Sequence, residues 1–198
     1  MELSKKQMLK YIIPRISRHD LLPMLLASLI GAVIAGVYGI LHDQISFTIS
    51  PEYYTKFKFN QFYYANFGFH DRIFAAEIGA LATWWVGFFC VWFLSRRLIP
   101  NQPRAKAYRQ ITIGFVIVGM FAVAAGIAGY VYGMLVELPV TNTQWAHAFR
   151  SLSIEQPENF IRVAYIHNAS YLGGISGLVI ALLTVQPSAV QKDEVQTA

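Results

Sequence analysis

Four ionisable side chains lie near one end of four apolar segments, and they are the residues best suited to chemistry: His42, Glu77, Glu137 and His167. Two imidazoles and two carboxylates form a ligand set suited to Zn, Fe or Mn. Ionisable groups inside a membrane are costly and usually face a bundle interior or a water-filled cavity. The sequence therefore predicts that packing of the four segments gathers these side chains at one mouth of the bundle, and a metal or cation site is one interpretation of that cluster.

The same residues have other interpretations. No H-E-x-x-H or E-x-x-H motif is present, so the site is inferred from placement and not from a motif. A hydrogen-bonded clamp between helices would use the same side chains, and Glu77 is also suited to proton-coupled transport. A haem would require His42 to face His167.

The composition indicates a membrane protein. The chain of 198 residues is 55% hydrophobic and 14% charged, whereas soluble domains carry about 25% charged residues. The net charge of +5 comes from basic residues that flank apolar runs, so it does not indicate a nucleic-acid partner. The single cysteine, Cys90, excludes an internal disulfide.

Four segments reach the roughly 20 apolar residues needed to cross a bilayer. They are approximately residues 21–41, 73–94, 111–136 and 163–185. Helices are expected because backbone groups in hydrocarbon must be satisfied within the segment. The first segment exceeds the roughly 7–15-residue core of a signal peptide, so we expect an uncleaved span. The predicted fold is an all-α integral-membrane four-helix bundle, with one domain over residues 1–186 and a polar cytoplasmic tail at 187–198.

Basic residues predict the orientation of the bundle. They cluster before the first segment and between the second and third: Lys5, Lys6, Lys10, Arg15 and Arg18, then Arg96, Arg97, Arg104, Lys106 and Arg109. Cytoplasmic loops carry an excess of Lys and Arg. Both termini are therefore expected in the cytoplasm, and the four ionisable groups near the outer face.

The two outer connectors carry short structural elements. In residues 44–66, Ser50-Pro51-Glu52 supplies an N-cap, a proline at the first helical position and an acid in the first turn. This pattern predicts a helix from residue 51 to about 66, lying in the membrane interface. Alternation of apolar and polar residues at the start of the stretch makes a strand the competing prediction. In the second connector we expect a short helix near 145–149, and the fourth membrane helix is expected to begin at residues 156–158.

Small residues predict how the helices pack. In lipid, helices associate where small side chains let backbones approach. At about 100° per residue, Gly31 and Gly39 share a face with His42. The third and fourth segments have similar small-residue faces: Gly119, Ala122, Gly126, Gly129 and Gly133 on the third, and Ser170, Gly174, Gly177 and Ala181 on the fourth. These faces turn the ionisable groups toward the bundle interior. Further polar side chains are expected around the site: Asp43, Tyr130 and Asn168.

Residues 42–59, with the sequence HDQISFTISPEYYTKFKF, resemble an outer connector in a group of uncharacterised bacterial four-span integral-membrane proteins. The resemblance covers this segment and the four-span layout. It implies a bacterial inner-membrane location and no particular activity.

The sequence favours a non-enzymatic structural or partner-binding membrane component, because it has no P-loop, dinucleotide fingerprint or nucleophile elbow. The aromatic first connector suits contacts with the lipid bilayer, with another copy of the chain or with a membrane protein partner. One alternative is an outward-facing metal or cation site holding Zn, Fe or Mn. A second alternative is a proton-coupled small-solute transporter.

Overall fold

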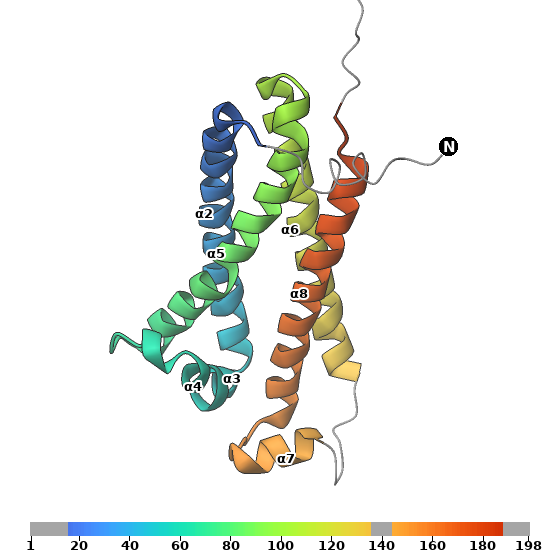
Figure 1. Cartoon of the computed structure of the whole chain (residues 1–198). Coiled ribbons are helices and arrows are strands. Elements are labelled where there is room, and N and C mark those ends of the chain that lie inside the picture. The colour runs from blue at the N-terminus through green and yellow to red at the C-terminus, as the bar shows by residue number, and fades with distance from the viewer. Residues whose placement is uncertain (1–15, 136–143, 188–198) are drawn as a thin grey trace, which may run out of the picture.

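The computed structural model describes residues 16–135 and 144–187, which are largely helical and contain no strand within those ranges. Four long helices form the body of the protein: α2 (Arg18–Ile49), α5 (Asp71–Leu98), α6 (Arg104–Leu135) and α8 (Pro157–Thr184), as Figure 1 shows. Each is long and apolar enough to cross a membrane. The predicted all-α fold with four membrane-spanning helices is confirmed.

Short helices gather at one end of the bundle, where α3, α4 and α7 lie together in Figure 1. The first connector contains α3 (Pro51–Tyr53), the π-helical turn η1 (Tyr54–Lys58), α4 (Phe59–Gln61) and the 3₁₀ turn η2 (Tyr63–Ala65). The second connector contains α7 (Gln144–Ser151), where a short helix is predicted. The 3₁₀ turn η3 (Ile99–Asn101) links α5 to α6.

The strand predicted as an alternative at the start of residues 44–66 is wrong. This stretch continues α2 as far as Ile49, and the next helix begins at Pro51 as predicted, with the Ser50 hydroxyl accepting a hydrogen bond from the Tyr53 amide at 3.3 Å. In a helix, residues two apart lie on nearly opposite sides, so the alternating apolar residues are divided between the protein interior and the outer surface. Ile45 is accordingly 66% exposed, whereas Phe47 is 7% exposed.

The long helices extend beyond the predicted apolar spans because hydropathy marks only the part that crosses hydrocarbon, whereas capping residues mark the ends. Ser17 caps α2 by accepting from the Asp20 amide, and His70 caps α5 by accepting from the Arg72 amide. The predicted start of the fourth helix is confirmed, since α8 begins at Pro157. The predicted end of the third helix at residue 136 and nearly all of the predicted tail lie outside the described residues.

The helices pack as two pairs, and α2 with α5 forms the first. A Cβ atom added to Gly39 would overlap the backbone of Gly79, and one added to Gly87 would overlap the backbone of Gly31. The Thr83 hydroxyl donates across this contact to the Ala35 carbonyl oxygen at 2.7 Å. Two backbones approach this closely only where both helices lack a side chain.

The second pair, α6 with α8, also packs through close backbone contacts at glycines. A Cβ atom on Gly129 would overlap the Tyr165 carbonyl group, and Gly173 makes an equally close backbone contact. Two predicted contact positions are wrong, because a Cβ atom on Gly119 or Gly174 would meet nothing within 4 Å. The rest of the predicted face of α8 is confirmed, since Ser170, Gly177 and Ala181 are buried, and Gly173 takes the contact position expected of Gly174.

An aromatic cap joins the two pairs at the end that carries the short helices. Its buried members come from α2, the first connector, α5 and α8: Phe47, Tyr53, Tyr54, Ala75, Phe160, Val163 and Ala164. Trp145 and Phe149 of α7 pack against this cluster. The first connector is therefore part of the core of the protein as well as a surface element.

A network of charged hydrogen bonds links the first connector to the second. The Glu52 carboxylate accepts hydrogen bonds from the backbone amides of Glu155, at 3.0 and 3.2 Å, and Gln156, at 2.7 Å. The Lys56 ammonium group donates to Glu52 and to the Ser153 carbonyl oxygen. Burial alone would raise the pKa of Glu52, but the hydrogen bonds from Lys56 and the two amides lower it below its ordinary value.

We expect the substitution Glu52→Gln to lower stability by about 1–2 kcal/mol at neutral pH, since it weakens charge-assisted hydrogen bonds at a partly exposed group. Because the pKa of Glu52 is lowered in the folded state, the contribution is complete above the unfolded pKa and is lost as the pH falls through the folded value. Thermal unfolding in detergent, followed by tryptophan fluorescence, measures the difference. A difference that stays constant down to pH 3 would contradict this account.

Candidate functional site

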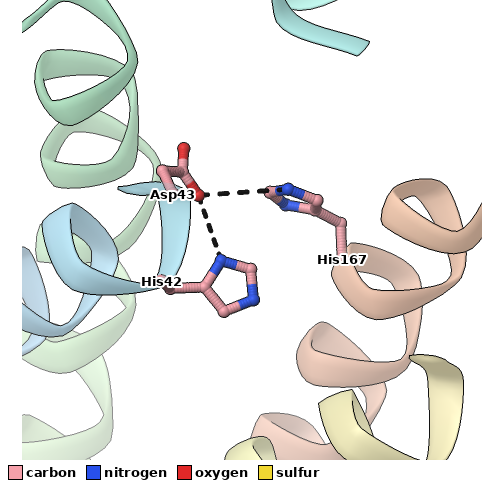
Figure 2. Close-up of side chains that lie close together, drawn as sticks. All are labelled: His42, Asp43 and His167. Carbon is pink, nitrogen blue, oxygen red and sulfur yellow. Dashed lines mark hydrogen bonds and ion pairs between the residues drawn. The ribbon is translucent and has the colours of Figure 1, made fainter. Parts of the chain in front are cut away.

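Two histidines and an aspartate meet beneath the aromatic cap (Figure 2). The Nδ1 atom of His42 lies 3.0 Å from Oδ1 of Asp43, and Nε2 of His167 lies 3.9 Å from the same oxygen. The rings of His42 and His167 are nearly perpendicular, with centroids 4.8 Å apart. One ligand atom from each of the three residues falls within 4.8 Å of the others.

The three side chains come from two helices that belong to different pairs. His42 and Asp43 are consecutive on α2, about 10 Å from its end at Ile49, and His167 lies on α8 about 15 Å from Pro157. Figure 2 shows the α2 side chains pointing across the space between the helices toward His167. Their side chains are 15%, 6% and 6% exposed. The cluster is thus a buried polar bridge between the two helix pairs.

Hydroxyl groups surround the cluster. The Tyr54 hydroxyl lies 3.3 Å from Nε2 of His167 and 2.6 Å from the Ser46 hydroxyl. On the other side, the Ser170 hydroxyl lies 3.4 Å from Nε2 of His42. Each imidazole therefore has a neutral hydroxyl partner in addition to the shared carboxylate.

The first connector covers the cluster. The Tyr53 ring stacks on the His167 imidazole with centroids 5.1 Å apart and planes at 17°, and it also contacts Phe160. Tyr53 is 4% exposed and Tyr54 has no exposed surface. The cap packs these rings over the histidine and separates the site from bulk water on that side.

Burial and the charge of Asp43 shift the pKa values of three residues of the first connector that lie near the site. Burial raises the pKa of Tyr54, and the negative charge of Asp43 raises it further, so this hydroxyl keeps its proton. Burial raises the pKa of Tyr53 as well. Burial lowers the pKa of Lys58, whereas the Asp43 charge raises it, and the Lys58 ammonium group lies 5.9 Å from the Tyr53 ring centroid. The Asp43 carboxylate therefore acts electrostatically on Lys58, a lysine of the first connector.

Comparison with protein-family models, with curated proteins and with solved structures finds no match. The functional argument therefore rests on the geometry of the site.

The structure brings together two of the four predicted ligands, His42 and His167. Glu77 is not a member of the group, and its partly buried side chain has one carboxylate oxygen, Oε2, with no hydrogen-bond partner among the described residues. Glu137 lies outside the described residues. Among the residues expected around the site, Tyr130 lines a groove together with His42, whereas Asn168 is exposed and lines a different groove.

Sequence reasoning missed three features of the site. Asp43 is expected only near the site, because consecutive residues on a helix point about 100° apart; in the structure its carboxylate turns back to His42 and lies in the group itself. The Tyr54 hydroxyl and the Tyr53 ring are missed because their segment is interpreted as an interfacial helix. The adjacent pair His42-Asp43 at the end of an apolar run is the one signal that favours this site.

The arrangement suits two kinds of chemistry among the described residues. Two imidazoles and a carboxylate from facing helices form a ligand set for a transition metal. The chain from Asp43 through His42 to Ser170 also has the order carboxylate, imidazole, hydroxyl. Ser170 lies within α8, where backbone amides bond along the helix, so it lacks the free backbone donors that usually stabilise an oxyanion. Metal binding is the better supported chemistry.

Proposed function

We propose that this multi-pass membrane protein binds a divalent transition metal through His42, Asp43 and His167. The observation that carries the proposal is the convergence of two imidazoles and a carboxylate within 4.8 Å across two helix pairs. Imidazole nitrogens together with a carboxylate suit Zn, Fe and Mn, and a site with three protein ligands leaves a position for water or substrate. The proposal replaces the predicted ligands Glu77 and Glu137 with Asp43.

The distances support a metal of ordinary size. Ligand atoms about 2.1 Å from a tetrahedral ion lie about 3.4 Å from one another. The two separations from Asp43, 3.0 and 3.9 Å, lie on either side of that value. The three ligand atoms lie within 4.8 Å of one another, so the widest separation exceeds the tetrahedral value by up to about 1.4 Å. Shifts of about 1 Å shared between the two histidine side chains would bring the three atoms to one ion.

The surroundings also fit a metal site. Histidine ligands are usually held by a hydrogen bond to the nitrogen that does not bind the metal. With Nδ1 of His42 facing Asp43, Nε2 is left for the Ser170 hydroxyl at 3.4 Å. The Tyr54 hydroxyl, 3.3 Å from Nε2 of His167, is placed to contact a water or substrate in the open position.

Metal analysis tests the proposal. We expect protein purified without chelator to contain about one equivalent of Zn, Fe or Mn per chain, measured by inductively coupled plasma mass spectrometry. The substitutions His42→Ala and His167→Ala remove ligands and should each reduce the metal to background. His147→Ala is the matched control, because His147 is an exposed histidine of α7 and should leave the metal content unchanged. A chain free of metal after growth and dialysis with each metal would overturn the proposal.

We further propose that the protein lies in a bacterial inner membrane with both termini in the cytoplasm and the site near the outer face. The support is the excess of basic residues at the start of α2 and around η3, opposite the aromatic cap. We expect an impermeant maleimide to label Tyr64→Cys on intact spheroplasts, and Ala105→Cys only after permeabilisation. Both positions are exposed, and the native Cys90 is buried. Reversed labelling would contradict this orientation.

The sequence-based preference for a structural or partner-binding component stays a prediction, as does proton-coupled transport through Glu77. A bound metal is compatible with either role. Glu77→Gln separates the second role from metal binding, since we expect it to leave the metal content unchanged.

A further inference from the structure

A groove of about 360 Å³ lies beside the metal site, between α2 and the α6–α8 pair. His42 and Ser170 lie in its wall, so one side of the cluster faces this groove. The remaining lining is mostly apolar and includes Ile45, Ile127 and Ile166. Ile45 is 66% exposed and Ile127 is 61% exposed, which shows that the groove opens at the surface of the bundle.

The opening lies at a particular depth in the membrane. His42 is about 30 Å along α2 from Leu21, which is about the thickness of the hydrocarbon core. The groove follows α2 on both sides of His42, from Tyr38 to Ile49. It therefore runs from the upper hydrocarbon into the headgroup layer, where the ester groups of glycerolipids lie, and the molecules at its opening are lipids.

The groove has hydrogen-bonding groups in the middle of its apolar wall. The Tyr38 hydroxyl is buried near Ser170 but makes no hydrogen bond of normal geometry with any described residue. The Ser170 hydroxyl makes a long contact of 3.4 Å with Nε2 of His42, and it lies close to the Tyr38 hydroxyl. An acceptor oxygen in the groove would satisfy the Tyr38 donor, and a buried donor left without a partner is costly.

We propose that this groove binds one membrane glycerophospholipid, with the upper part of an acyl chain against Ile45 and Ile127 and an ester oxygen at Tyr38 and Ser170. The walls match a hydrocarbon chain, the polar groups match an ester, and the depth matches the ester layer of the bilayer. The inference goes beyond metal binding and does not depend on it. If the metal site is also formed, the lipid ester lies beside His42.

Photocrosslinking tests the inference on the full-length protein. The probe is a phosphatidylcholine that carries a diazirine near the ester end of one acyl chain, incorporated into vesicles of bacterial phospholipids. We expect adducts, mapped by peptide mass spectrometry, to concentrate on residues 38–49 and 123–130. Ile127→Trp fills the groove and should reduce these adducts about tenfold. Val33→Trp is the matched control, since Val33 is 68% exposed on α2 outside the groove, and its labelling should equal that of the wild type.

A second variant addresses the hydrogen bonds alone. Tyr38→Phe removes the hydroxyl and keeps the ring, and we expect the retained lipid, measured by native mass spectrometry after detergent exchange, to fall at least about threefold. Adducts spread evenly over the lipid-facing helices, or equal labelling in wild type and Ile127→Trp, would overturn the inference. Asp43→Asn should weaken metal binding at least about 100-fold and leave the labelling intact, so failure of the metal proposal and failure of the lipid proposal give different results.

Discussion

The substitution Gly39→Ala is expected to prevent the α2–α5 pair from forming, with a loss of at least about 3 kcal/mol. A Cβ atom at this position would overlap the Gly79 carbonyl group and the Thr83 hydroxyl, and both belong to a helix that cannot move aside as a flexible side chain can. Separation of the two backbones would also break the hydrogen bond from Thr83 to the Ala35 carbonyl. In lipid, where close packing drives helix association, little would replace these contacts.

Size-exclusion chromatography in mild detergent, with thermal unfolding of the monodisperse fraction, measures the effect. The matched controls are Gly119→Ala and Gly174→Ala, which add the same methyl group to membrane helices where it meets nothing within 4 Å. Both controls should match the wild type or slightly exceed it, since alanine favours helix over glycine by about 1 kcal/mol. If Gly39→Ala unfolds with the controls, the backbone contact between α2 and α5 is not as close as described.

The fold was predictable because four hydrophobic runs of sufficient length leave few alternatives to a helical bundle. The helix starts at Pro51 and Pro157 were also predictable, since a helix start depends on residues adjacent in sequence. The pairing of helices was harder to predict. On α8 the close contact is made by Gly173 and not by its neighbour Gly174, because small residues occur on more than one side of that helix and the partner helix determines which of them is in contact.

The site was only partly predictable for a related reason. Position along a helix placed His42 and His167 at similar depths, so their approach followed from the bundle alone. Which carboxylate joins the two histidines depended on a side-chain rotation. The Asp43 carboxylate turns toward His42, a direction that its position on the helix alone does not predict. The contribution of Tyr54 depended on how the first connector folds back over α8, which no local pattern encodes.

Asp43→Asn is expected to weaken metal binding at least about 100-fold, since loss of residues that merely orient ligands already costs about 10–100-fold. The substitution keeps the shape of the side chain and removes its charge, so it separates metal coordination from packing. The carboxylate is also the group common to both histidines, at 3.0 Å from His42 and 3.9 Å from His167. Asp43→Asn therefore removes the anionic ligand and keeps both imidazoles.

The decisive measurement is thermal unfolding with and without added Zn²⁺. At a free metal concentration 100 times the wild-type Kd, the metal should stabilise the wild type by about 2.7 kcal/mol and the variant by about 0.4 kcal/mol if its Kd rises 100-fold. Glu158→Gln is the control, because it removes an exposed carboxylate from the start of α8, and it should respond to the metal as the wild type does.

If the three side chains form only a hydrogen-bonded clamp, the response to metal differs. Asp43→Asn would then change stability by the same amount with and without Zn²⁺, and the metal would stabilise neither protein. The stability of the two metal-free proteins does not separate the hypotheses, because the variant alters the same hydrogen bond between Asp43 and His42 in both. A metal site predicts instead that the difference between wild type and variant grows by about 2.3 kcal/mol when Zn²⁺ is added at 100 times the wild-type Kd.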